Sequence, residues 1–127
     1  MIDHVTIRVT HLSESRAFYE KVLAPFSYKV IFGDENIFWA FDIGNGALFE
    51  IAKHEGHERI TSSHIAFRAK NQQVVEQFYQ AAIEAGGKCN GAPGPRPQYT
   101  STYYAAFVHD PDGHNIEAVF DHKNKPY

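Results

Sequence analysis

The sequence predicts an α+β fold built from two copies of one βαβββ module, and three observations support this. Residues 4–9 (His-Val-Thr-Ile-Arg-Val) align without a gap with residues 64–69 (His-Ile-Ala-Phe-Arg-Ala). Further along, residues 46–51 align with residues 113–118 and match a glycine and a glutamate. Each half also reads as a strand, a helix and three more strands, an order typical of α+β rather than parallel α/β folds.

The first half is expected to open with a strand over residues 2–9, where apolar and polar residues alternate. A helix follows, with Ser13 as its predicted N-cap, and Pro25 prevents it from continuing. Its apolar residues recur at helical spacing. The three remaining strands are predicted over residues 29–32, 37–43 and 47–52, with turns at residues 34–36 and 44–46.

The second half repeats this order, starting with a strand over residues 64–69. Asn71 is the predicted N-cap of its helix, and two glycines at residues 86–87 end that helix. Strands are expected around residues 88–89, over residues 103–109 and over residues 115–120, with an Asp-Pro-Asp-Gly turn at residues 110–113. Residues 53–63 link the halves, and residues 91–99, with three prolines and two glycines, are predicted to form a stiff loop.

Length and composition favour one domain over residues 1–127, with repeat modules at about residues 1–55 and 62–122. A net charge of -3 and a pI near 6.2 argue against partners such as nucleic acid or an anionic membrane surface. No apolar run is long enough to span a membrane, and the first residues do not resemble a secretory signal. Cys89 is the only cysteine, which excludes an intrachain disulfide and favours a reducing, cytoplasmic location.

Two histidines and two glutamates occupy equivalent positions in the repeat: His4 with His64, and Glu50 with Glu117. Strand alternation places both histidines on the face opposite the apolar residues. Each glutamate lies within an apolar strand, where an unpaired charge would be very costly. Two imidazoles and two carboxylates suit Zn, Ni, Mn, Co or Fe, whereas Ca and Mg prefer shells made only of oxygen. The alternative is that each is an ordinary residue with hydrogen-bonded side chains.

Three segments carry a resemblance to a known family: Asp-His-Val at residues 3–5, Arg-Ala-Phe-Tyr at residues 16–19, and Asp-Pro-Asp-Gly-His-Asn-Ile-Glu at residues 110–117. From residue 2 to residue 120 the chain resembles the vicinal oxygen chelate superfamily, which includes glyoxalase I, extradiol dioxygenases, fosfomycin-resistance enzymes and bleomycin-binding proteins. The resemblance implies two βαβββ modules forming an open, cup-like mixed sheet around a metal, with the helices outside. It implies His4, His64 and Glu117 as ligands, and Glu50 as a fourth ligand in glyoxalase I-like members.

The resemblance favours an enzyme: a glyoxalase I-like lyase or isomerase that uses a divalent metal on a small substrate with vicinal oxygens. Glu117 or Glu50 would be the catalytic proton shuttle. Arg8 lies where bacterial glyoxalase I carries an arginine that holds the glutathione carboxylate, whereas His54 replaces an expected asparagine. The candidate substrate-binding residues are Thr6, Arg8 and Tyr104, the last grouped with Arg96, Tyr99 and Tyr103 as possible pocket residues.

Other functions stay open from the sequence. Thr6 and residues 110–118 also match fosfomycin-resistance enzymes, which transfer a thiol to an epoxide. A non-catalytic, bleomycin-type binding protein is another alternative, and an extradiol dioxygenase is disfavoured because it needs further acid–base histidines. The histidines at positions 109, 114 and 122 are expected in exposed segments and receive no role. A homodimer is expected because such modules leave sheet edges open, with the metal held within one chain or across two.

Overall fold

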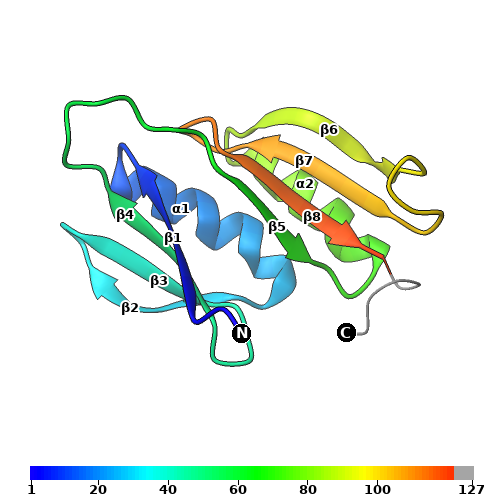
Figure 1. Cartoon of the computed structure of the whole chain (residues 1–127), viewed down its shortest axis with the longest axis horizontal. Helices are drawn as coiled ribbons and strands as arrows, with labels where there is room; N and C mark the ends of the chain where they lie inside the picture. Colours follow the sequence, from blue (N-terminus) through cyan, green and yellow to red (C-terminus); the bar gives the residue numbers. More distant parts are fainter. Residues whose placement is uncertain (122–127) are drawn as a thin grey trace.

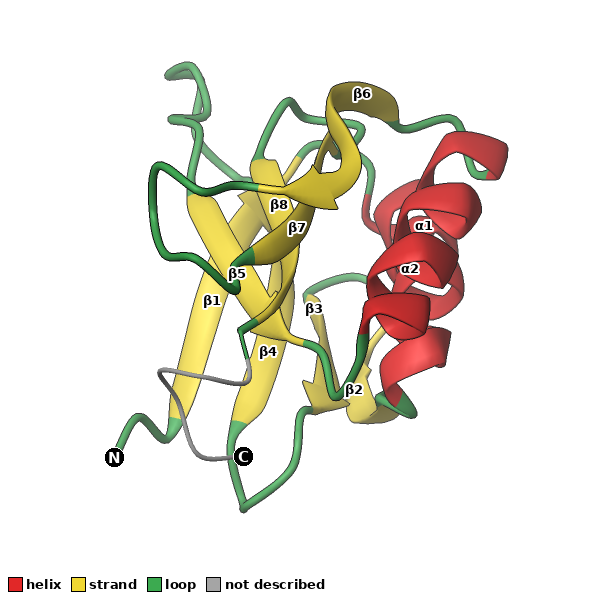
Figure 2. Ribbon diagram, turned by 90° about the vertical axis from the view of Figure 1, so that its right-hand side faces the viewer, coloured by secondary structure: helices red, strands yellow, loops and turns green. Residues whose placement is uncertain are grey.

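The computed structural model describes residues 1–121, which form two four-stranded mixed sheets with one helix packed on each (Figures 1 and 2). The predicted α+β class and the order of elements are confirmed. The first module contains β1 (His4–Val9), α1 (Leu12–Leu23), the 3-10 helix η1 (Ala24–Phe26), β2 (Lys29–Asp34), β3 (Phe38–Asp42) and β4 (Leu48–Lys53). The second contains β5 (His64–Arg68), α2 (Gln72–Glu84), β6 (Lys88–Pro95), β7 (Tyr104–His109) and β8 (Asn115–Phe120).

Both sheets have the same topology, as expected of a duplicated module. The strand orders are β1-β4-β3-β2 and β5-β8-β7-β6, so β1 and β5 each lie at the edge of a sheet. β1 runs parallel to β4, and β5 runs parallel to β8, whereas the remaining pairs are antiparallel. In this register Thr6 lies opposite Glu50, and Ala66 lies opposite Glu117. The glutamates are therefore at equivalent places in the two sheets.

The hydrophobic core fills the space between the sheets and the two helices, which also pack against each other (Figure 2). Ile7 on β1 and Ile116 on β8 point into it and are almost fully buried, whereas His4, Thr6 and His64 are exposed. This is the two-residue alternation predicted for these strands. The sheet faces turned away from the helices, hereafter the open faces, thus carry the polar residues. Among the described residues, neither helix is long and apolar enough to cross a membrane.

The helix boundaries confirm one predicted cap and correct the other. Asn71 caps α2, because its Oδ1 accepts a hydrogen bond from the Val74 amide at 2.9 Å. Ser13 is not the cap of α1: the helix starts at Leu12 with His11 as N-cap, and that cap makes no side-chain hydrogen bond. Leu12 is buried as the first helical residue, so burial of an apolar side chain rather than a side-chain cap determines where α1 begins.

Strand β6 is longer than predicted and includes part of the segment expected to be a loop. It extends to Pro95, with register shifts on either side of Gly91. Prolines are tolerated here because β6 is an edge strand that pairs only with β7. Its pairing is irregular, so the ladder does not need an N–H group at the proline positions. Gly91 has a φ of 150°, at which an ordinary side chain would also meet Phe107. Composition alone therefore underestimated this strand.

The Asp-Pro-Asp-Gly turn between β7 and β8 joins the two modules. Asp110 is buried and accepts a hydrogen bond from the Tyr19 hydroxyl of α1 at 2.5 Å. Asp112 accepts hydrogen bonds from the backbone amide of Thr10 at 3.1 Å and from its hydroxyl at 2.5 Å. A motif that looked like a plain turn in the sequence is thus a contact between residues about a hundred positions apart.

His114 was expected in an exposed loop, and this prediction is wrong. Its side chain is fully buried. The Ser63 amide donates to Nδ1 at 2.8 Å, so Nε2 carries the proton and donates to the Arg8 carbonyl at 2.7 Å. The neutral ring is satisfied at both nitrogens because the turn packs against the end of β1. His109 ends β7 and is half-buried, and residue 122 lies outside the described residues.

Candidate metal centre

The second module places His64 beside Glu117 on the open face of its sheet. His64 Nε2 lies 3.1 Å from Glu117 Oε2, and Glu117 is only 3% exposed. His64 Nδ1 is 3.0 Å from the Asn115 carbonyl oxygen, which can only accept, so Nδ1 carries a proton. In the neutral ring Nε2 is then unprotonated and its lone pair faces a carboxylate oxygen. Such a contact requires a cation or an added proton between the two atoms.

The spacing of these two atoms suits adjacent ligands of one metal ion. Metal bonds of about 2.0–2.2 Å at angles of about 90–109° place neighbouring ligand atoms about 2.8–3.6 Å apart. The 3.1 Å between His64 Nε2 and Glu117 Oε2 lies inside this range. Donation of the other ring N–H to a backbone carbonyl is also the arrangement that orients metal-ligating histidines. The donor set therefore fits a divalent cation.

The other oxygen of Glu117 has a partner of its own. Tyr103, just before β7, donates a hydrogen bond from its hydroxyl to Glu117 Oε1. Burial first, and the contact with Glu117 second, hold the pKa of Tyr103 well above its usual value. The phenol therefore stays protonated and acts as a donor over the whole physiological pH range. Beside the pair, the His64 ring stacks on Phe107 with the ring centroids 6.4 Å apart.

The first module carries the equivalent residues, His4 on β1 and Glu50 on β4, which interact through their charges. His4 Nδ1 lies 2.7 Å from Asp3 Oδ1, and this hydrogen bond, followed by the charge of Glu50, raises the pKa of His4. Thr6 donates from its hydroxyl to Glu50 Oε2 at 2.8 Å. With Nδ1 turned to the Asp3 carboxylate, the neutral ring of His4 keeps Nε2 as its free donor atom. Both histidines are thus oriented for ligation through Nε2.

Within one chain the two pairs do not meet. The His114 bridge from Ser63 to Arg8 places the start of β5 beside the end of β1. His4 is four residues further back, about 13 Å along the strand. Figure 1 shows the cause: β1 and β5 run in opposite directions, so their first residues start at opposite ends. Among residues 1–121, no three His, Cys, Asp or Glu side chains are close enough to hold a metal ion.

The structure brings two of the three predicted substrate-binding residues together and places the third elsewhere. Thr6 and Arg8 line one cavity of about 270 Å³, together with His54 and Arg59 of the linker between the modules. Tyr104 does not join them, because its hydroxyl donates to Glu76 of α2 at 2.9 Å. Successive residues of a strand point to opposite faces, so Tyr103 reaches the open face and Tyr104 the helix side. Arg59 and the Tyr103–Glu117 contact carried no signal in the sequence pattern.

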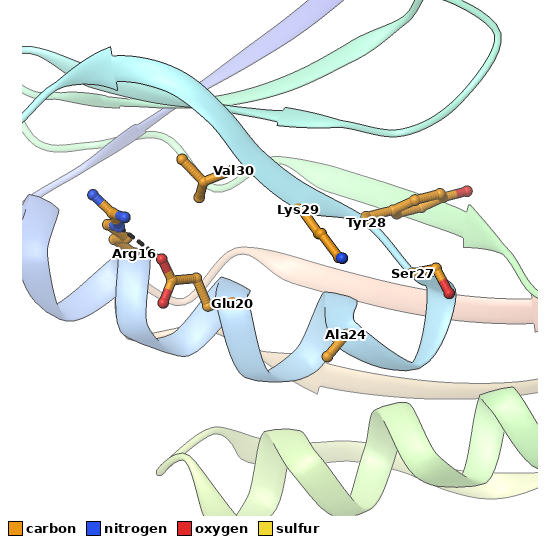
Figure 3. A pocket seen from close by; sticks show the side chains of 7 residues that line it. All are labelled: Arg16, Glu20, Ala24, Ser27, Tyr28, Lys29 and Val30. Atoms are coloured by element: carbon orange, nitrogen blue, oxygen red, sulfur yellow. Dashed lines mark hydrogen bonds and ion pairs between the residues drawn. The ribbon is translucent and has the colours of Figure 1, made fainter.

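Two further cavities lie away from the first. One, of about 290 Å³, includes the two residues that contact the His64 ring, and its lining residues are Asn90, Gly91, Arg96, Tyr99, Phe107 and Asn115. The other, of about 510 Å³, lies between α1 and the start of β2 (Figure 3). There Arg16 Nε pairs with Glu20 Oε1 at 2.7 Å and its guanidinium stacks over Trp39. The residues that line this 510 Å³ cavity include none of the predicted ligands.

Comparison with known proteins identifies relatives along nearly the whole chain. The model of the Glyoxalase/Bleomycin resistance protein/Dioxygenase superfamily matches residues 1–118. Metallothiol transferase FosB from Shouchella clausii (strain KSM-K16) is 29% identical over 123 residues, covering 91% of this chain and 77% of the relative.

Solved structures share the fold. A glyoxalase/bleomycin resistance protein from Albidiferax ferrireducens T118 has a TM-score of 0.83 and 26% identity, covering 94% of this chain and 98% of the other. A mutant of the fosfomycin resistance protein FosX from Listeria monocytogenes, complexed with Mn(II) and a dihydroxypropylphosphonic acid, has a TM-score of 0.69. It is 22% identical, and the match covers 93% of this chain and 87% of that one.

Proposed function

Since the chain belongs to the Glyoxalase/Bleomycin resistance protein/Dioxygenase superfamily, we propose that it is a divalent-metal enzyme acting on a small substrate with two adjacent oxygens. The observation that carries this proposal is the His64–Glu117 pair. The 3.1 Å between His64 Nε2 and Glu117 Oε2, with Nδ1 directed to a carbonyl, allows both atoms to bind one cation. The proposed ligands are His4, Glu50, His64 and Glu117.

We assign the complete site to a homodimer. A twofold axis relating two copies would bring the His4–Glu50 pair of one subunit against the His64–Glu117 pair of the other, and would do so twice. The open edges of β1 and β5, which carry the histidines, favour such an arrangement. Such a dimer would supply the further ligands that each pair lacks, since no three His, Cys, Asp or Glu side chains of the described residues are close enough to hold a metal ion within one chain.

The reaction we favour is of the glyoxalase I type, in which a proton moves between neighbouring carbons of a hemithioacetal. A bound metal would stabilise the negative charge that develops on the substrate oxygens. Glu50 is better suited than Glu117 to carry the proton, because it is only half-buried and accepts one hydrogen bond from the described residues, that of Thr6. Glu117 has both oxygens engaged, by Tyr103 and His64.

The cavity beside Thr6 favours a substrate with a negatively charged group. Arg8, Arg59 and Glu58 line it, and the two guanidinium groups outnumber the one carboxylate, which suits a carboxylate or phosphonate on the substrate. His54 is turned toward the linker, since its Nε2 is 2.8 Å from the Glu58 carbonyl oxygen. The thiol part of the hemithioacetal is therefore expected to carry an acidic group held by Arg8.

The test is elemental analysis of the native protein followed by assays with hemithioacetals of several acidic and neutral thiols. We expect one metal per chain, isomerisation that depends on it, and loss of isomerisation on Glu50→Gln. Retention of the metal by Glu50→Ala would leave a three-ligand site. Metal-free native protein that binds small aromatic compounds with undiminished affinity would favour a binding protein and contradict the proposal.

A second candidate reaction is thiol transfer to an epoxide, favoured by the 29% identity with a metallothiol transferase over 91% of this chain. Opening an epoxide with a thiolate needs no base at the position of Glu50. Glu50→Gln that still holds its metal, as shown by elemental analysis, would therefore retain thiol transfer, whereas it would lose isomerisation. Expression in fosfomycin-sensitive cells provides the direct test, and protection there would decide for the transferase.

A further inference from the structure

We infer that Tyr103 is a positioning residue that restricts Glu117 to binding the metal through one oxygen, Oε2. The inference rests on the proposed metal function. It goes beyond the ligand set, because Tyr103, which is not a ligand, would control whether Glu117 binds through one oxygen or two. The observation behind it is that the two oxygens of Glu117 are already differentiated. Oε1 accepts the Tyr103 hydroxyl, and Oε2 faces His64 Nε2.

Burial makes this hydrogen bond decisive for how the carboxylate is oriented. Glu117 is 3% exposed, so water cannot easily replace the phenol as the donor to Oε1. A metal bound symmetrically by both oxygens would compete with Tyr103 for Oε1. Keeping the hydrogen bond therefore directs the metal to Oε2, beside His64. The position that a second carboxylate oxygen would have taken then stays open for a substrate oxygen.

The segment that carries Tyr103 is held in place independently of Glu117. The hydroxyls of Thr100 and Thr102 donate to the two oxygens of Asp121, at 3.0 and 2.5 Å. The carbonyl of Tyr103 accepts from the Arg96 amide at 2.8 Å, and its ring packs edge-on against Tyr99 with centroids 5.0 Å apart. Because backbone, ring and neighbouring side chains are all anchored, the hydroxyl is presented to Oε1 before any metal arrives.

The chain offers a matched control in the next residue. Tyr104 also donates from its hydroxyl to a carboxylate, that of Glu76, but on the helix side of β7. Tyr104→Phe removes the same kind of hydrogen bond, one position away, without touching the proposed ligands. Tyr103→Phe keeps the ring against Tyr99 and removes only the contact with Glu117.

The experiment measures Zn²⁺ affinity by competition with a chromophoric chelator, and the visible spectrum of the Co²⁺-loaded protein, for wild type and both variants. Tyr103→Phe is expected to weaken Zn²⁺ binding by about 10–100-fold, the usual effect of removing a group that orients a ligand. Its Co²⁺ bands should also change, because Glu117 becomes free to bind through both oxygens. Tyr104→Phe should match wild type in both measurements.

Wild-type affinity or an unchanged Co²⁺ spectrum in Tyr103→Phe would overturn the inference. Glu117→Gln separates this from failure of the proposed function. If Glu117→Gln binds Zn²⁺ as tightly as wild type, or wild type binds none, the metal site itself is refuted. If only Tyr103→Phe is unaffected, the positioning role alone fails. Should circular dichroism show Tyr103→Phe to be unfolded, Thr102→Val loosens the same segment and should weaken Zn²⁺ binding in the same direction.

Discussion

Replacing Tyr19 by phenylalanine tests whether the buried contact between α1 and the Asp-Pro-Asp-Gly turn holds the modules together. Tyr19 is fully buried, and its hydroxyl donates to Asp110 Oδ2 at 2.5 Å. The substitution keeps the ring, which packs edge-on against Phe18 and Phe49. Only the hydrogen bond is lost, so any change in stability reports on that single contact.

The magnitude follows from what remains around Asp110. Its Oδ1 still accepts the backbone amides of Asp112 and His114, at 2.9 and 2.8 Å. Only Oδ2 loses the Tyr19 hydroxyl. A buried hydrogen bond to a charged group contributes about 1.5–3 kcal/mol, and we expect a loss of about 2 kcal/mol in the free energy of unfolding. For a chain of this length this corresponds to a fall in Tm of about 6–10 °C.

The assay is urea unfolding at one fixed protein concentration, followed by far-UV circular dichroism and by the fluorescence of Trp39, the only tryptophan. Tyr104→Phe is the control, because its hydrogen bond to Glu76 is exposed and should contribute less than about 1 kcal/mol. Equal losses in the two variants would refute the reasoning, since burial would then make no difference to the Tyr19–Asp110 contact.

Four further predictions concern the pKa of Tyr19, the buried His114, the helix caps and the metal. Burial first, and the charge of Asp110 second, hold the pKa of Tyr19 well above 10, so the unfolded chain releases this proton earlier. The stability advantage of wild type over Tyr19→Phe should be complete below about pH 10 and shrink as the pH rises beyond it, as measured by urea titrations at several pH values. His114→Ala leaves two backbone groups unpaired next to a void and should lower the unfolding free energy by about 3–5 kcal/mol in the same assay. Asn71→Ala should cost about 1 kcal/mol and Ser13→Ala nothing, since only the first removes a cap; equal effects would contradict this assignment. Stripping the metal with a chelator should lower Tm, and metal added back at about 100 times its Kd should restore about 2.7 kcal/mol; an unchanged Tm would argue against a metal held by the folded state.

The repeat and the strand alternation were sufficient to predict the modules and their faces. Alternation is a local property: a strand that covers a core must place apolar side chains at every second position, whatever lies beyond it. For this reason the burial of Ile7 and Phe67, and the placement of both histidines on the opposite face, were correctly predicted. The Asn71 cap could be predicted for the same reason, because a cap depends only on the next three residues.

Residues whose roles depend on distant partners could not be assigned from the pattern. His114 looked like a loop histidine because its partner, the Arg8 carbonyl, lies 106 positions away. Tyr103 and Tyr104 are adjacent and chemically identical, and only the face that each one takes separates a contact with Glu117 from one with Glu76. That face depends on where β7 begins in the sheet, and sequence patterns place strand ends only within a few residues.

By itself the sequence determined the fold class, the duplication and the four metal-binding candidates, because each follows from short-range periodicity or from comparing the two halves. Only the tertiary structure decided how those candidates are grouped. Packing of the modules through their helices and through the turn at residues 110–113 sends β1 and β5 in opposite directions. His4 and Glu50 therefore lie apart from His64 and Glu117 within one chain, a separation that no local pattern encodes.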